Sequence, residues 1–159
     1  MILPIPQENL LGFLLNAKRY TYASQEDDAA VKPLVRGSRQ LEFRQGALFY
    51  RDIYFGGEYF VGQETVYFKS DPVWGMSYAG GVIQGIEADE IAGVFSFLKS
   101  ALQKVTAEAP FRGPASFQSG AFHYTNRSLG NLERFSGTES INYENRSIYH
   151  LHYSGGLLR

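Results

Sequence analysis

The sequence predicts an α+β fold, built as a tandem repeat in which one helix precedes a four-stranded antiparallel meander (an α-β4 unit). Two stretches of the chain match each other without a gap at an offset of 75 (133 − 58 and 153 − 78). Glu58-x-Phe60-x-Gly62-x-Glu64-x-Val66 matches Glu133-x-Phe135-x-Gly137-x-Glu139-x-Ile141, and Trp74-x-x-x-Tyr78-x-Gly80-Gly81 matches Tyr149-x-x-x-Tyr153-x-Gly155-Gly156. We therefore expect a single domain over residues 1–159, with repeat units at about 7–83 and 89–159.

Composition supports a β-rich protein and excludes several kinds of function. The chain has 17 Gly, 11 Tyr and 12 Phe, which is typical of strands joined by tight turns. It has no Cys, so it contains neither a disulfide framework nor thiolate chemistry. The N-terminal apolar run is short and is interrupted by Asn16 and Lys18, so we expect neither a signal peptide nor a membrane span. These features fit a reducing compartment and predict no membrane partner.

Two helices are predicted from apolar residues at helical spacing. The first covers residues 7–20, where Leu10, Leu14 and Ala17 recur on one face and Lys18 and Arg19 lie in the last turn. The second covers residues 89–105, with a stripe of six apolar side chains: Ile91, Val94, Phe95, Leu98, Leu102 and Val105. We expect Phe60, Phe135, Phe95 and Leu98 to be deeply buried between sheet and helices.

Alternating, aromatic-rich runs follow each helix and predict the strands. In the first unit we expect strands near 40–45, 47–55, 58–68 and 73–79, and in the second near 116–119, 121–128, 132–143 and 147–154. The segment 23–35 is the most loop-like. The two meanders can join edge to edge into one sheet with two helices on one face, which covers two sheet edges and leaves the other face open.

The repeated glutamates are the first candidates for chemistry. Glu58, Glu64, Glu133 and Glu139 share the inward parity of their strands, and clustered buried carboxylates can have raised pKa values suited to acid–base or metal chemistry. A structural role is favoured, because a buried carboxylate is costly unless it is paired. In that case Gly62 and Gly137 mark bulges or tight turns, and the glutamates cap backbone N–H groups or pair with Arg36 and Arg112.

The aromatic residues supply the leading candidate for a binding surface. Tyr50, Asp52 and Tyr54 alternate with Phe49, Ile53 and Phe55, so one of the two rows must face away from the helices. We take the row Tyr50, Asp52 and Tyr54 as that surface. The full set of candidate ligand-binding residues is Tyr50, Asp52, Tyr54, Glu58, Glu64, Trp74 and Tyr78.

Metal, cofactor and nucleic-acid sites are not expected. His150 and His152 share one face of a strand, but their counterparts in the first unit are Gly75 and Ser77, and a third ligand would have to be His123 or a carboxylate. No phosphate loop, dinucleotide fingerprint or nucleophile elbow is present. Four arginines lie close together, Arg36, Arg39, Arg44 and Arg51, but Glu42 interrupts them and no recognition helix accompanies them, so we expect no nucleic-acid partner.

Three motifs resemble those of an uncharacterised bacterial domain of unknown function. They are Asp52-x-Tyr54-x-Gly56-Gly57-Glu58-x-Phe60-x-Gly62-x-Glu64, Trp74-x-Met76-x-Tyr78-x-Gly80 and the closing Tyr149-x-x-x-Tyr153-x-Gly155-Gly156-Leu157-Leu158-Arg159. That domain is found alone or behind Xre-type helix-turn-helix regulators. The resemblance implies a cytoplasmic bacterial protein and brings no catalytic residues with it. The tandem plan also resembles that of small proteinaceous enzyme inhibitors, at the level of the fold.

Three functions are compatible with these observations. The leading one is a non-catalytic module that binds or senses a small molecule or peptide, which agrees with the regulator-associated domain. The second is a hydrolase-type enzyme that uses the paired glutamates or a metal held by His150 and His152. The third is a protein–protein interaction or inhibitor module that acts through the face of the sheet. The ligand and the oligomeric state do not follow from the sequence.

Overall fold

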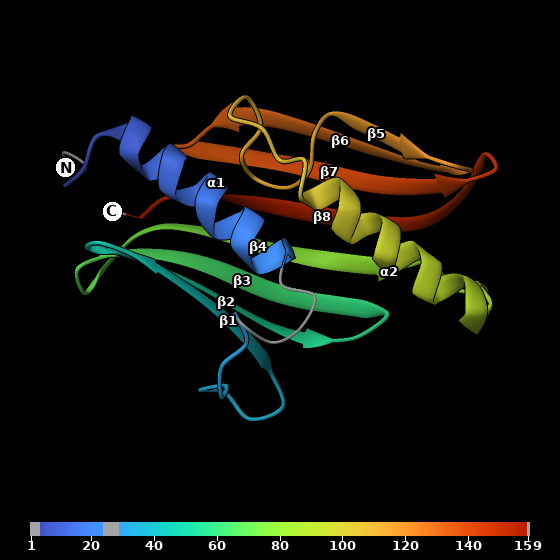
Figure 1. Cartoon of the computed structure of the whole chain (residues 1–159), viewed down its shortest axis with the longest axis horizontal. Coiled ribbons are helices and arrows are strands. Elements are labelled where there is room, and N and C mark those ends of the chain that lie inside the picture. Colours follow the sequence, from blue (N-terminus) through green and yellow to red (C-terminus); the bar gives the residue numbers. More distant parts are fainter. Residues whose placement is uncertain (1–3, 24–28, 159) are drawn as a thin grey trace.

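Over the residues that the computed structural model describes, 4–23 and 29–158, the chain forms one eight-stranded antiparallel sheet and two helices (Figure 1). Each helix precedes one four-stranded meander, which confirms the predicted fold class. The elements are α1 (Gln7–Ala23), β1 (Arg39–Gln45), β2 (Leu48–Gly56), β3 (Tyr59–Phe68), β4 (Asp71–Val82), α2 (Ala88–Leu102), β5 (Ser116–Ser119), β6 (Phe122–Asn131), β7 (Arg134–Tyr143) and β8 (Arg146–Leu157). Of the predicted loop 23–35, residues 24–28 lie outside the described part.

The last strands of the two meanders pair with each other and join them into one sheet. The strand order is β1-β2-β3-β4-β8-β7-β6-β5, and β4 pairs antiparallel with β8 from Trp74↔Leu157 to Val82↔Tyr149. This pairing covers one edge of each meander, so that only β1 and β5 remain at the edges of the sheet. Neither described helix is long and apolar enough to cross a bilayer.

The two meanders share the register of their third hairpin, β3–β4 and β7–β8. Val66 faces Trp74, Ile141 faces Tyr149, and a bulge follows Val66 and Ile141 alike, so the offset here is 75 (141 − 66 and 149 − 74). The second hairpins, β2–β3 and β6–β7, differ by one residue in their turns. Glu64 faces Asp52, whereas Glu139 faces Asn126. The structural counterpart of Asp52 is therefore Asn126, at an offset of 74 (126 − 52).

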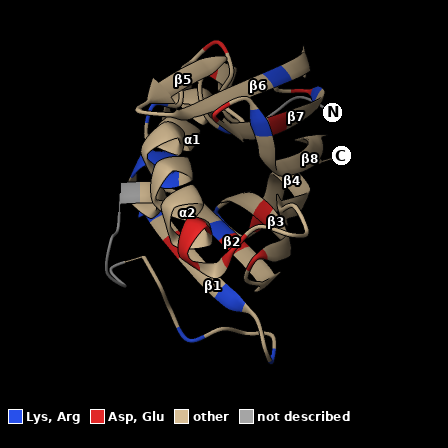
Figure 2. Cartoon of the chain, turned by 90° about the vertical axis from the view of Figure 1, so that its right-hand side faces the viewer, with Lys and Arg blue, Asp and Glu red and all other residues tan. Residues whose placement is uncertain are grey.

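The sheet curls around the two helices, which lie on its concave side (Figure 2). The core between them contains Leu98 and Phe135, as predicted. Phe60 and Phe95 are only half-buried, which corrects the prediction for these two residues. In place of Phe95, helix α2 buries Phe97, whose ring stacks on Phe117 and Phe122 of the second meander.

The orientation of α2 leads to a testable difference between two neighbouring phenylalanines. Phe97 is 6% exposed, and truncation of a buried Phe typically destabilises a protein by about 3–5 kcal/mol. We expect Phe97→Ala to lower the free energy of unfolding by this amount and Phe95→Ala to lower it clearly less. Urea unfolding of both variants beside the parent measures the difference. A larger loss for Phe95→Ala would show that α2 is rotated about its axis relative to the structure.

Candidate functional site

Five charged side chains are buried between the helices and the sheet. They are Lys18, Asp52, Glu64, Arg112 and Glu139, and their exposed fractions lie between 0% and 6%. Charges in such an environment are strongly unfavourable unless ion pairs and hydrogen bonds compensate the lost hydration. The partners of each group therefore decide what this cluster can do.

In the second half of the chain the buried carboxylate has a complete set of partners. Arg112 donates from Nη2 to Oε1 of Glu139 at 2.6 Å, and the hydroxyl of Tyr149 donates to the same oxygen at 2.8 Å. The hydroxyl of Tyr124 donates to Oε2 at 2.7 Å. The predicted pairing of Glu139 with Arg112 is confirmed, and this site has the geometry of a structural ion pair.

In the first half the corresponding site is incomplete. Glu64 is paired through Oε2 with Nζ of Lys18, which also donates to the carbonyl oxygen of Phe111 at 2.7 Å. The predicted partner Arg36 lies instead in an exposed loop, which corrects that pairing. Tyr50 and Trp74 occupy the positions of Tyr124 and Tyr149. Within the described part of the chain, however, the Tyr50 hydroxyl, Trp74 Nε1 and Glu64 Oε1 have no hydrogen-bond partner.

Gly62 and Gly137 do not mark bulges, contrary to the prediction. Each lies opposite a tyrosine, in the pairs Gly62↔Tyr78 and Gly137↔Tyr153, and a Cβ at either glycine would overlap the tyrosine ring. The glycine thus gives the tyrosine ring a path across the strand. The hydroxyl of Tyr78 donates to Oδ1 of Asp52 at 2.7 Å, and that of Tyr153 donates to Oδ1 of Asn126 at 2.8 Å.

Strand parity is consequently unbroken through the repeated motif. Glu64 and Glu139 point inward, as the alternation predicts. Glu58 and Glu133 precede β3 and β7 in their turns and are exposed, so their predicted inward orientation is wrong. The strand period does not extend into these turns, and it therefore carries no information about their side chains.

A cavity of about 440 Å³ lies between α2 and the first meander, beside the ionic cluster. Leu41, Phe60, Phe95, Leu98 and Leu102 form its apolar walls. Four polar side chains lie at the buried end: Tyr22, Asp52, Tyr78 and Arg112. Arg39 and Glu58 are exposed and line its opening. An apolar pocket with a few convergent polar groups is typical of small-molecule sites.

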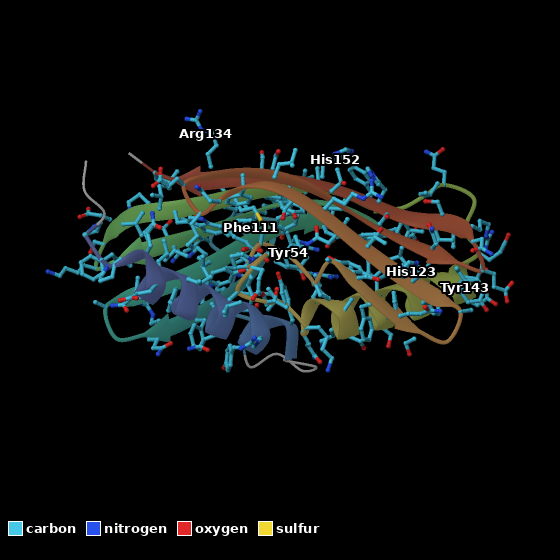
Figure 3. All side chains as sticks on the ribbon, turned by 90° about the horizontal axis from the view of Figure 1, so that it is seen from above. Tyr54, Phe111, His123, Arg134, Tyr143 and His152 are labelled. Carbon is cyan, nitrogen blue, oxygen red and sulfur yellow. The ribbon has the colours of Figure 1, made fainter. Side chains whose placement is uncertain are left out.

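The predicted ligand-binding residues separate into two groups. Asp52, Tyr54, Glu58 and Tyr78 line the cavity, and Tyr54 lies on the helix side of the sheet together with Phe111 (Figure 3). The other three, Tyr50, Glu64 and Trp74, are fully buried behind it. The row Tyr50, Asp52 and Tyr54 therefore faces the helices and not the open face, which is a correction.

Sequence reasoning missed Lys18, Tyr22 and the α2 residues as parts of this site. The sequence predicts Lys18 as a charge at a helix end, but α1 continues to Ala23 and the lysine is in the interior. The available signal was its spacing, because Lys18 follows Leu10 and Leu14 at intervals of four and thus shares their apolar face.

The environment of Asp52 alters its protonation. Burial raises its pKa and the nearby Glu64 carboxylate raises it further, whereas the hydrogen bond from Tyr78 and the charges of Lys18 and Arg112 act in the opposite direction. The resulting pKa is about 7, against an ordinary value of 3.8. Burial lowers the pKa of Lys18, against the opposing effect of Glu64. Asp52 can therefore gain or lose a proton near neutral pH.

The outer face of the sheet carries the histidines and a second hollow. The rings of His150 and His152 lie 4.5 Å apart on exposed positions, and His152 points away from the helices (Figure 3). Among the described residues, no group of three or more His, Cys, Asp or Glu could hold a metal ion. The hollow, of about 1110 Å³, is lined by residues of β2, β3, β4, β6, β7 and β8 and includes the exposed Phe55, Val61 and Leu129.

Comparison with known proteins identifies a family and no activity. A family model described as a domain of unknown function, DUF5680, matches residues 52–158. No curated protein and no solved structure matches the chain. The matched region contains Asp52, Glu64, Arg112 and Glu139, whereas Lys18 lies before it.

Gly62 should be intolerant of even one added methyl group. We expect Gly62→Ala to lower the free energy of unfolding by about 1–3 kcal/mol, the usual range for an overpacked interior, because the Cβ displaces the Tyr78 ring. Gly12→Ala is the control, since Gly12 is exposed in α1 with no atom near its added Cβ, and alanine there should stabilise the helix by about 0.5–1 kcal/mol. An unchanged urea midpoint for Gly62→Ala would contradict the described path of Tyr78.

Because the pKa of Asp52 is raised, replacing its carboxyl group by an amide should stabilise the fold by an amount that depends on pH. Between pH 3.8 and about 7 the folded state holds a proton that the unfolded state has lost, so this group stabilises the fold at low pH and that contribution disappears as pH rises through 7. At pH 8 we expect Asp52→Asn to raise the free energy of unfolding by about 1–4 kcal/mol, at about 1.4 kcal/mol per pKa unit.

This gain should shrink between pH 7 and pH 4, where Asp52 is protonated in the folded state, and thermal melts across this range measure it. The control Asp71→Asn removes an exposed carboxylate and should show no such trend. A gain for Asp52→Asn that is equal at pH 4 and pH 8 would show that proton binding at Asp52 is not its source.

Proposed function

The chain belongs to the DUF5680 family, and we propose that it is a non-catalytic module that binds a small organic molecule in the cavity between α2 and the first meander. One observation carries the proposal. Four buried or half-buried polar side chains, Tyr22, Asp52, Tyr78 and Arg112, line the cavity together with five apolar ones, while the charged Arg39 and Glu58 are exposed. This arrangement combines burial of an apolar body with specific polar contacts.

Unsatisfied polar atoms support the presence of a ligand. The hydroxyl of Tyr22 and Nε of Arg112 belong to residues that line the cavity, and neither atom has a hydrogen-bond partner in the described part of the chain. A buried polar group without a partner costs about 1–3 kcal/mol. Both atoms are covered by the protein, so a bound molecule would complete these hydrogen bonds, and gain affinity from them, after the two side chains turn towards it.

The size of the cavity favours a small molecule over a peptide. A volume of about 440 Å³ lies within the range of small-molecule sites, and it would accept no more than one or two side chains of a peptide. The resemblance to a bacterial domain found alone or behind Xre-type regulators supports a sensing role in the cytoplasm, because domains appended to such regulators often bind effectors.

A hydrolase has weaker support. Glu64 and Glu139 are each held by a cation, Lys18 and Arg112, so neither is placed as a free general acid or base. The other proposed centre, His150 and His152, lies on the exposed outer face away from the cavity. The repeated glutamates are better explained as groups that position the helices.

A protein–protein interaction or inhibitor module is the second candidate. The outer face is hollowed over six strands, and four large apolar side chains that line the hollow are exposed: Val35 at 45%, Phe55 at 41%, Val61 at 48% and Leu129 at 78%. Apolar side chains gathered on an exposed surface are typical of interaction sites. This candidate requires a partner protein, whereas the cavity requires a small molecule.

Adjacent residues on β3 allow the two candidates to be separated. Phe60 lines the cavity and Val61 lies on the outer face. We expect fragments with an aromatic or aliphatic body to shift the amide NMR signals of Tyr54, Phe60 and Leu98 in the parent. Phe60→Trp, which fills the cavity, should weaken this binding at least tenfold, a change of about 1.4 kcal/mol, while Val61→Trp should leave it unchanged.

The contrary result would be a set of shifts confined to the outer face, at Ile53, Ser77 and Ser136, that is lost in Val61→Trp and retained in Phe60→Trp. That result would favour the interaction module. Unfolding curves of both variants should be recorded first, so that a loss of binding is compared only between folded proteins.

A further inference from the structure

We propose that the ligand of this cavity is an organic cation, a primary or secondary amine with an apolar body, whose nitrogen binds the carboxylate of Asp52. This inference rests on the proposed function and specifies the chemical class of the ligand. It follows from the charges in the interior, from a comparison of the two halves of the chain and from the nature of the cavity walls.

The buried charges leave one carboxylate without a cation. Lys18 pairs with Glu64 and Arg112 pairs with Glu139, so these four groups cancel. Asp52 accepts a hydrogen bond from the neutral hydroxyl of Tyr78, and no cation of the described residues lies within ion-pair distance of it. An ionised Asp52 therefore gives the interior an excess of one negative charge, which a ligand with one positive charge would neutralise.

The counterpart of Asp52 in the second half of the chain shows which side chain is sufficient for folding at this position. Asn126, the counterpart of Asp52, accepts a hydrogen bond from Tyr153 and donates through Nδ2 to the carbonyl oxygen of Gly113 at 2.8 Å. A neutral amide thus satisfies the fold there. The segment that contains Gly113 is buried over Asn126, whereas the matching Arg36-Gly37 segment is exposed. Asp52 is consequently left facing the cavity.

The cavity walls suit an amine better than an anion. The aromatic rings of Tyr54 and Phe60 can attract an organic cation, and Phe95 and Leu98 provide an apolar surface for the rest of the ligand. The ring of Tyr78 already has the guanidinium of Arg112 over it, at 5.4 Å from the ring centroid. A ligand carboxylate would instead approach Asp52, with Glu64 close behind it.

Binding of an amine should strengthen as pH rises through neutrality. Burial raises the pKa of Asp52 most and Glu64 on β3 raises it further, whereas Tyr78 on β4, Lys18 on α1 and Arg112 after α2 lower it, which gives a pKa of about 7. Tyr22 on α1 and, at the opening, Arg39 and Glu58 also line the cavity that Asp52 faces. An aliphatic amine, with a pKa of about 10, stays charged throughout this range. The carboxylate alone therefore determines the trend.

Three probes with the same indole body and different heads test the inference: tryptamine (cation), tryptophol (neutral) and indole-3-propanoate (anion). Their dissociation constants are measured by calorimetry at pH 8 and pH 6. We expect tryptamine to bind about tenfold or more tightly than tryptophol at pH 8, as a charge-assisted hydrogen bond exceeds a neutral one, and indole-3-propanoate to bind weakest. The preference for tryptamine should be smaller at pH 6, where Asp52 is largely protonated.

Asp52→Asn should abolish this preference and its pH dependence while tryptophol binding is retained. This variant places at position 52 the amide that the second half carries at Asn126. Asp71→Asn is the matched control, because it removes one exposed carboxylate and the same total charge. If Asp52→Asn does not fold, the pH dependence of tryptamine binding to the parent protein still tests the inference.

Two outcomes would overturn the inference. If tryptophol or indole-3-propanoate binds as tightly as tryptamine, and Phe60→Trp abolishes that binding, the cavity is a binding site but not one for cations. If none of the three probes binds, the cation proposal fails. The fragment titration with Phe60→Trp and Val61→Trp then decides separately whether the cavity binds small molecules.

Discussion

The burial of Lys18 is the constraint on which the arrangement of the helices depends. An ammonium group without exposure to water needs partners on all sides, and Lys18 finds them in Glu64 of β3 and in the carbonyl oxygen of Phe111. These partners belong to the first meander and to the segment after α2, so a single side chain of α1 ties both halves together. Loss of any one partner would leave a buried charge uncompensated. Arg112 follows Phe111 directly, and the same tie therefore brings the guanidinium to Glu139.

The repeat places two related polar sites in the interior, and they differ in how many of their polar atoms have hydrogen-bond partners. Glu139 has donors on both oxygens, from Arg112, Tyr124 and Tyr149. Glu64 has Lys18 on one oxygen only. A fold needs its buried polar groups satisfied, and in the second half both oxygens of the buried carboxylate meet this requirement. The first half leaves polar atoms without hydrogen-bond partners near a cavity. A molecule bound there can make hydrogen bonds that the protein itself does not make.

The shape of the cavity depends on the tyrosine ring that lies across the glycine Gly62. Tyr78 reaches Asp52 because Gly62 has no side chain between them, and the ring then forms part of the cavity wall. In the second half, Tyr153 crosses Gly137 in the same way but meets Asn126, over which the segment of Gly113 is folded. One backbone design thus supports a closed amide site in one half and an accessible carboxylate in the other. The two halves differ in the loop before each meander, and Asp52 has a carboxylate oxygen where Asn126 has its amide nitrogen.

The sequence by itself determined the repeat, the order of helices and strands, and the alternation that turns Glu64 and Glu139 inward, because these features depend on local period and on internal similarity. It also indicated the Arg112–Glu139 pair. It did not determine which face of β2 meets the helices, since Tyr50, Asp52 and Tyr54 alternate with the equally bulky Phe49, Ile53 and Phe55. Nor did it reveal that Lys18 is buried, that Phe97 replaces Phe95 in the core, or that Asp52 is left without a cation. These depend on how two helices and a curled sheet pack in three dimensions, where partners far apart in the sequence meet, such as Lys18 and Glu64, which are 46 residues apart.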